Sequence, residues 1–204
     1  MLTLYDHPLS GNCHKVRLFL SILGLSYKSV FIDVPAGANH ESAFVAMNPL
    51  RQIPVLSDGD YTVQDSQAIL VYLARRYLPE WAGSDAFESG TIMQWLSFAA
   101  NEIGNSLQPA RVFYLLGEEV DIELAQRKGL RALSLLDAHL GRQQWLACGR
   151  PTIADIACFP YVALSREGHL PLDEFGNVLT WIASITRLPG YIDMPGLPPP
   201  AGTT

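Results

Sequence analysis

The N-terminal part of the chain alternates short apolar runs with a stretch of helical periodicity. Residues 2–5 form an apolar run that predicts a strand, and residues 7–11 end it with proline, serine and glycine. Residues 26–34 predict a second strand. Between the two, apolar side chains recur at helical spacing, at Val16, Phe19, Leu20 and Leu23. Two strands joined through one helix by short connections indicate a parallel βαβ unit.

The following residues predict a short helix, an antiparallel pair of strands and a further helix. The ranges are 41–47 for the short helix, 53–56 and 61–63 for the strands, and a start at Asp65 and Ser66 for the last helix. The turn residues between the two strands favour a hairpin. The resulting order, βαβ then α then ββα, predicts a thioredoxin-like α/β domain over residues 1–78.

The rest of the chain has a helical pattern. Residues 79–86 have the composition of a linker, residues 87–195 predict an all-α domain, and residues 196–204 predict a loose tail rich in proline and glycine. Apolar stripes support the helices, at Trp95, Phe98 and Ala99 and at Leu130, Leu133, Leu136 and Leu140. The sequence TIAD at 152–155 predicts a capping box, in which residues 152 and 155 cap each other's backbone.

Composition narrows the class of protein. The formal net charge of −6, with scattered basic residues, argues against a nucleic-acid partner. Three cysteines make neither a disulfide framework nor a zinc site, so we expect free thiols and no metal. No apolar run is long enough for a membrane span, and the first residues lack the pattern of a signal peptide. The expected location is the cytoplasm.

Four motifs give the chain a resemblance to a known family. They are PLSGN at 8–12 followed by KVRL at 15–18, NPLRQIPVL at 48–56, DSQAIL at 65–70 and TIAD at 152–155. In this order and at these intervals they resemble the soluble, cytosolic-type glutathione transferases, in particular bacterial-like members whose active-site loop carries a serine. The resemblance covers nearly the whole chain. It implies glutathione as cosubstrate, no tightly bound cofactor and a homodimer.

The catalytic task that this resemblance implies is to convert the glutathione thiol into a thiolate. Ser10 precedes the first helix, where a hydroxyl donor and the helix dipole both favour the charged sulfur. Serine is also a common helix cap, so Ser10 alone is ambiguous. Asn12 is an alternative donor or cap, and Cys13 is a further alternative that would form mixed disulfides or simply pack as a small thiol. His14 is expected on the helix surface.

The resemblance also implies where the tripeptide binds. It implies that the Ile53–Pro54 bond is cis. The Ile53 backbone would then pair with the cysteinyl backbone of glutathione, which would bind like an added β-strand. A proline that merely begins a strand is the alternative. Gln52 would hydrogen-bond the tripeptide beside it.

A helix N-terminus favours an anion, so the γ-glutamyl carboxylate is expected at the hydroxyl and amide of Ser66. Asp65 would then face the γ-glutamyl ammonium. Both residues are also ordinary caps, and the family often has the longer glutamate at position 65. His40 resembles a contact to the glycyl end, with a solvated loop residue as its alternative. Arg51 stands where the family often has glycine, and it either contacts the glycyl carboxylate or lies in solvent.

Three functions remain open at this level. The first is transfer of glutathione to a small hydrophobic electrophile bound against the helical domain, where Phe113, Tyr114 and Leu115 are candidate wall residues. The second is another glutathione-dependent reaction, as peroxidase, disulfide reductase or isomerase. The third is a non-catalytic interaction protein on the same fold. The apparent presence of Gln52 and the 65–66 pair favours a working glutathione site.

Overall fold

A computed structural model of the chain describes residues 1–200, and its first part is built on one mixed sheet. The strands are β1 (Leu2–Asp6), β2 (Tyr27–Phe31), β3 (Val55–Asp58) and β4 (Tyr61–Gln64), in the order β2-β1-β3-β4. Strand β1 runs parallel to β2 and antiparallel to β3, and β3 pairs with β4 as a hairpin. This is the predicted thioredoxin-like arrangement.

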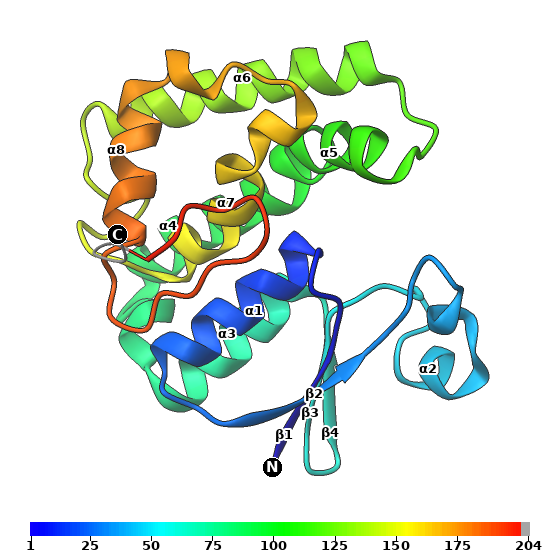
Figure 1. The fold of residues 1–204 in the computed structure, drawn as a ribbon. Helices are drawn as coiled ribbons and strands as arrows, with labels where there is room; N and C mark the ends of the chain where they lie inside the picture. The colour runs from blue at the N-terminus through cyan, green and yellow to red at the C-terminus, as the bar shows by residue number, and fades with distance from the viewer. Residues whose placement is uncertain (201–204) are drawn as a thin grey trace.

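Helices cover both faces of the sheet. Helices α1 (Gly11–Ile22) and α3 (Ser66–Tyr77) lie between the sheet and the helical part of the molecule, while α2 (Ser42–Met47) lies away from them (Figure 1). Phe44 of α2 packs in a small separate core with Ile32 and Val55. The N-terminus of α1 therefore points toward the helical part, which brings the Ser10 loop to the junction of the two.

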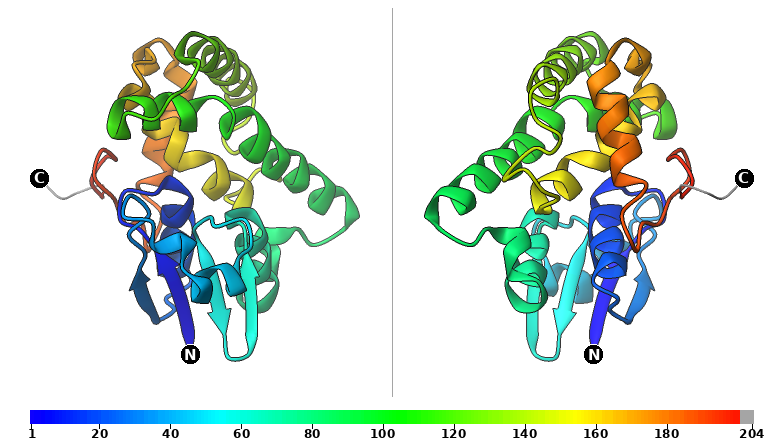
Figure 2. Two further views of the ribbon diagram at one scale, coloured as in Figure 1. Left: turned by 90° about the vertical axis from the view of Figure 1, so that its right-hand side faces the viewer. Right: turned by 90° about the vertical axis from the view of Figure 1, so that its left-hand side faces the viewer.

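The helical part follows a short 3-10 turn at Pro79–Ala82. Its helices are α4 (Ala86–Phe98), continued by a π-helical turn at Ala99–Ile103, α5 (Leu107–Leu116), α6 (Ile122–Leu140), α7 (Ile153–Ala163) and α8 (Gly176–Ile185). Two further 3-10 turns, Ser165–Gly168 and Leu172–Glu174, join α7 to α8. Figure 2 shows the N-terminal end of α4 projecting from the body of the molecule.

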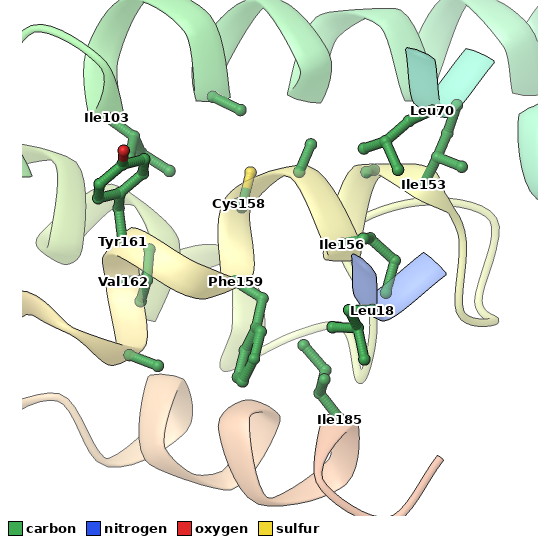
Figure 3. Close-up of a cluster of buried hydrophobic side chains, with 14 of the residues drawn as sticks. Leu18, Leu70, Ile103, Ile153, Ile156, Cys158, Phe159, Tyr161, Val162 and Ile185 are labelled. Carbon is green, nitrogen blue, oxygen red and sulfur yellow. The ribbon is translucent and has the colours of Figure 1, made fainter. Parts of the chain in front are cut away.

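Helix α7 is the centre of the core. Every residue from Ile153 to Ala163 is buried, as expected for a helix that is apolar all round. Figure 3 shows Leu18 of α1, Leu70 of α3 and Ile185 of α8 around it. A single apolar core therefore runs from the sheet helices into the helical part, and α7 fixes how the two sit against each other.

The predicted capping box begins α7. The Thr152 hydroxyl accepts from the Ala154 N–H at 3.3 Å, and the Asp155 carboxylate accepts from the Thr152 N–H at 3.0 Å. Asp155 also accepts from the indole of Trp181 at 2.9 Å and from the Leu146 N–H at 3.0 Å. Burial raises the pKa of Asp155 to about 6, and these hydrogen bonds act in the opposite direction.

The structure corrects three expectations. His14 is fully buried rather than on the surface, because α1 is covered by α7 on one side and by the chain near Ile192 on another. Leu130 is 38% exposed and does not belong to the buried stripe of α6. The predicted tail packs at its start, where Leu197 is buried and the Tyr191 hydroxyl donates to the Pro198 carbonyl at 2.8 Å. Residues 201–204 of that tail lie outside the described residues.

The burial of His14 predicts an acid-sensitive fold. Burial lowers the pKa of His14 from 6.5 to about 3, so below pH 6.5 the unfolded chain binds more protons there than the folded chain. The free energy of unfolding should fall as pH drops from 6.5 toward 3. Between pH 7 and pH 5, the free energy of unfolding of His14→Leu should fall by on the order of 2 kcal/mol less than that of the wild type. Urea unfolding of both proteins at the two pH values measures this, and an equal loss in the variant would contradict it.

Candidate active site

A cavity of about 840 Å³ opens between the Ser10 loop, the loop before β3, the π-helical turn after α4 and helix α5. Five of the eight predicted site residues line it: Ser10, Asn12, Gln52, Ile53 and Asp65. They come from three separate segments of the chain, which the sheet and the two helices packed on it bring together. The fold thus gathers most of the predicted site around one space.

Ser10 is the N-cap of α1. Its hydroxyl oxygen accepts from the Cys13 N–H at 3.2 Å, and its backbone is extended, as a cap requires. A hydroxyl that accepts in this way still has its own hydrogen to donate. Capping and donation to a ligand are therefore compatible at Ser10, and the positive end of α1 faces the same space.

Arg17 fixes the loop that leads to Ser10. Its guanidinium donates to the carbonyls of His7 at 3.1 Å and Pro8 at 3.0 Å, and it forms an ion pair with the buried Asp6. The loop thus has its carbonyls satisfied from within the domain. The sequence motif contained Arg17, but its position two turns into the helix gave no sign of this contact.

The close approach of Gly11 to Tyr161 holds the N-terminus of α1 against α7. A Cβ on Gly11 would lie 2.8 Å from the Tyr161 ring, so no larger residue fits without movement. The ammonium of the buried Lys15 lies 5.5 Å from the centre of the same ring, and burial lowers the pKa of Lys15 to about 8. The Tyr161 ring also forms part of the cavity wall beside Ser10.

The two rivals of Ser10 differ in their access to the cavity. Cys13 is fully buried, does not line the cavity, and has a pKa raised to about 12, mainly by burial. Its thiol is therefore unsuited to attack a disulfide. Asn12 does line the cavity, and its side-chain carbonyl accepts from the Ser66 hydroxyl at 3.3 Å. Within residues 1–200 the Asn12 side-chain amide N–H groups make no hydrogen bond, so they are available to a ligand.

The Ile53–Pro54 peptide bond is cis. Both ladders of β3 begin at Val55, so the backbone of Ile53 lies outside them while the residue lines the cavity. Pro54 itself is buried behind the cavity wall. The Asn48 side chain donates to the Gln52 carbonyl at 2.7 Å and steadies this turn.

Arg51 is at the cavity, although it was not among the predicted site residues. It lines the cavity and has a left-handed backbone with φ of 58°, which explains why glycine suits this position. The Asn39 side chain donates to the Arg51 carbonyl at 2.8 Å. His40 is exposed and lies outside the cavity wall, but its Nδ1 is 3.2 Å from the Arg51 guanidinium. The predicted site residue His40 therefore contacts Arg51 and does not line the cavity.

Asp65 and Ser66 begin α3 at the cavity. Asp65 is its N-cap and accepts from the Gln67 and Ala68 N–H groups, both at 3.0 Å. Its φ of 73° is a conformation that costs energy in any residue but glycine, and such residues often lie at functional sites. Ser66 is 3% exposed and does not line the cavity, with its hydroxyl against Asn12.

The helices supply the remaining wall. Leu115 of α5 lines the cavity, while the other two candidates, Phe113 and Tyr114, do not. Ala99, Ala100 and Gly104 face it from the π-helical turn, where the Gly104 N–H bonds to the Ala99 carbonyl five residues back. This wall has small side chains on the π-helical side, and α5 adds aliphatic side chains together with Gln108 and Arg111, so part of it suits an apolar group.

The described part of the chain offers neither a metal site nor a membrane span. Within residues 1–200, no three His, Cys, Asp or Glu side chains gather closely enough to hold a metal ion. No helix in that range is long and apolar enough to cross a membrane. The cavity presents a serine hydroxyl, amides, two helix N-termini, the charged side chains of Arg51, Asp65 and Arg111, and a patch of apolar side chains.

A thioredoxin-like domain with a cis-proline turn, joined to a helical domain with a cavity between them, is the architecture of glutathione transferases. The family models for the glutathione S-transferase N-terminal and C-terminal domains match residues 1–75 and 118–184. Glutathione S-transferase 3 of Zea mays is 30% identical over all of this chain and 98% of its own length. The chain belongs to the glutathione S-transferase family.

Solved structures agree with this assignment. A glutathione S-transferase from Pseudomonas fluorescens superposes with a TM-score of 0.91 at 28% identity, covering 95% of this chain and 98% of that one. The glutathione transferase URE2P6 of Phanerochaete chrysosporium, solved in complex with oxidised glutathione, superposes with a TM-score of 0.78 at 31% identity, covering 88% of each chain.

Two substitutions at Asp65 should separate its capping from its charge. Asp65→Asn keeps a good N-cap, so its free energy of unfolding should stay within about 0.5 kcal/mol of the wild type. Asp65→Ala removes both cap bonds and should cost about 1–2 kcal/mol. Both variants lose the carboxylate and should bind glutathione at least about tenfold more weakly. Urea unfolding and calorimetric binding measure the two effects, and full affinity in Asp65→Asn would contradict a charge role.

Proposed function

We propose that this chain is a glutathione transferase in which Ser10 stabilises the glutathione thiolate for attack on a small hydrophobic electrophile. The observation that carries the proposal is that Ser10 and the segments expected to bind the tripeptide line one cavity, whose remaining wall combines small and aliphatic side chains with Gln108 and Arg111. The transferase names of the relatives support the reaction class. We propose the domain division 1–78 and 87–195, joined by 79–86.

Ionising the thiol of bound glutathione near neutral pH requires a moderate stabilising free energy. A free thiol has a pKa of about 8.5, so little of it is ionised near neutrality. Lowering that pKa by about two units takes roughly 2.7 kcal/mol of preferential stabilisation of the thiolate. A hydroxyl hydrogen bond to the charged sulfur and the N-terminus of α1 act together at Ser10. Asn12 offers a second donor on the same turn.

The tripeptide is proposed to lie along the N-terminal wall. The free backbone of Ile53 pairs with the cysteinyl residue, and Gln52 bonds beside it. Asp65 faces the γ-glutamyl ammonium. The Ser66 amide binds the γ-glutamyl carboxylate, because the next two N–H groups of α3 are already taken by Asp65. Arg51, held near His40, is placed for the glycyl carboxylate.

The rival functions are less well supported. A disulfide reductase that used Cys13 would need an accessible, acidic thiol, and Cys13 is neither. Peroxidase or isomerase chemistry on bound glutathione remains an alternative for the same site. A non-catalytic interaction protein would not need the Ser10 hydroxyl and the tripeptide segments around one cavity.

Ser10→Ala tests the proposed role. It should bind glutathione within about threefold of the wild type, since uniform binding is retained. Its kcat/KM with 1-chloro-2,4-dinitrobenzene at pH 6.5 should fall by roughly 10- to 100-fold, with the lower pKa of the pH profile shifted upward. Ser10→Thr keeps a hydroxyl and is the matched control. Equal turnover by Ser10→Ala and wild type would exclude this role.

We further propose a homodimer in the cytoplasm, with the N-terminal domain of each subunit against the helical domain of the other. Helix α4 projects from the body of the molecule (Figure 2). Its Phe87 and Met93 are 87% and 53% exposed, and Tyr61 of β4 is 54% exposed. Exposed apolar side chains on both parts of the subunit are what such an interface needs.

A doubly substituted α4, Phe87→Glu with Met93→Glu, should be a monomer. Two buried like charges per subunit disfavour an apolar interface. Light scattering after gel filtration measures the mass. A double substitution on the exposed face of α6, Leu130→Glu with Leu135→Glu, is the control and should keep the mass of the wild type. A dimeric Phe87→Glu, Met93→Glu protein would place the interface elsewhere.

A further inference from the structure

One side of the cavity is formed by a single stripe of helix α5. Gln108, Arg111, Val112 and Leu115 all line the cavity, and their spacing of three, four and seven residues places them on one face. The stripe is polar toward the start of the helix and apolar toward its end. Whatever binds against it meets a hydrogen-bonding end and an apolar end.

Arg111 is the charged member of this stripe, and its hydrogen-bonding capacity is only partly used. It is 3% exposed. Its Nε donates to the Glu167 carboxylate at 2.5 Å, and its Nη1 donates to the Leu9 carbonyl at 2.7 Å. Within residues 1–200, Nη2 makes no hydrogen bond. It is also not completely buried. Because Arg111 lines the cavity, Nη2 has that space in which to find a partner.

The position of Arg111 relates it directly to the thiol end of the cavity. Leu9 precedes Ser10, and successive Cα atoms are only about 3.8 Å apart. A guanidinium bonded to the Leu9 carbonyl therefore lies beside the place where Ser10 holds the sulfur. Val112 and Leu115 lie farther along the helix. An electrophile that places its reacting carbon at the sulfur thus has the Arg111 donor near its reacting end and apolar side chains along the rest.

We infer that the electrophiles preferred at this site are α,β-unsaturated carbonyl compounds with an apolar substituent, and that Nη2 of Arg111 donates to the carbonyl oxygen. This rests on the proposed transferase function. The sulfur lone pair forms the S–C bond at the β-carbon while the alkene and carbonyl π pairs shift, which leaves an enolate oxygen. Arg111 keeps its proton and stabilises that oxygen by a charge-assisted hydrogen bond. Water then protonates the α-carbon. The hydroxide that remains combines with the proton that the thiol released when the thiolate formed.

The chemistry of the electrophile distinguishes this role from a general one. In displacement at an alkyl halide, the negative charge leaves on the halide and no oxygen gains charge. A donor aimed at oxygen selectively accelerates addition to the α,β-unsaturated carbonyl compound, because only interactions that strengthen in the transition state raise the rate. If Arg111 acted only by holding the Leu9 carbonyl or by stabilising the thiolate, both reactions would depend on it equally.

The test compares two electrophiles that share a phenyl group, trans-4-phenyl-3-buten-2-one and benzyl bromide. The measured quantity is the ratio of their kcat/KM values, which is insensitive to the fraction of active protein. Arg111→Met should lower the ratio roughly 100- to 1000-fold, the usual effect of losing one donor to a developing oxyanion. An unchanged ratio, with both activities reduced alike, would overturn the inference and leave the transferase function intact.

Glu167→Gln is a second variant in case Arg111→Met does not fold. Glu167 is partly exposed at the surface, and its substitution keeps Arg111 and the Leu9 contact but removes the carboxylate that offsets the guanidinium charge. The ratio should hold or rise in this variant, and a fall would contradict the inference. A wild-type protein that binds glutathione and turns over neither electrophile would overturn both this inference and the transferase function.

Discussion

The packing of α1 on α7 is the constraint on which the site depends. Helix α7 is buried on all sides, and α1 meets it where Gly11 leaves room for the Tyr161 ring. That approach sets the position of the first turn of α1, and with it the Ser10 hydroxyl, the Asn12 amide and the positive end of the helix. The core that joins the two parts of the molecule thus positions the Ser10 loop. Two arginines, Arg17 and Arg111, donate hydrogen bonds to the carbonyls of this loop.

The fold could be predicted from the sequence because its signals are local. The apolar runs that became β1 and β2, the stripe of α1 and the capping box at Thr152 and Asp155 are each readable within a few residues. The candidate site residues came from the family resemblance, and three of them, Ser10, Ile53 and Asp65, stand at element boundaries on the cavity wall. The ends of the elements moved by a few residues, since tertiary packing decides them.

What could not be predicted depends on contacts between distant segments. Nothing local distinguishes the buried His14 from a surface histidine, because the covering chain comes from near Ile192. Arg111 pairs with Leu9 and Glu167, far away in sequence on both sides. The positive φ of Asp65 also escaped notice, since glycine, the usual signal of such a conformation, is absent there, whereas the family's frequent glycine at position 51 is in keeping with the left-handed backbone of Arg51.

The central claim is that this cavity ionises the thiol of bound glutathione. Its most direct test is a pH titration of the thiolate absorbance of glutathione mixed with stoichiometric wild-type protein. The account predicts that the bound thiol ionises about two pH units below free glutathione. Glutathione that binds the protein with an unshifted thiol pKa would contradict thiolate activation at Ser10.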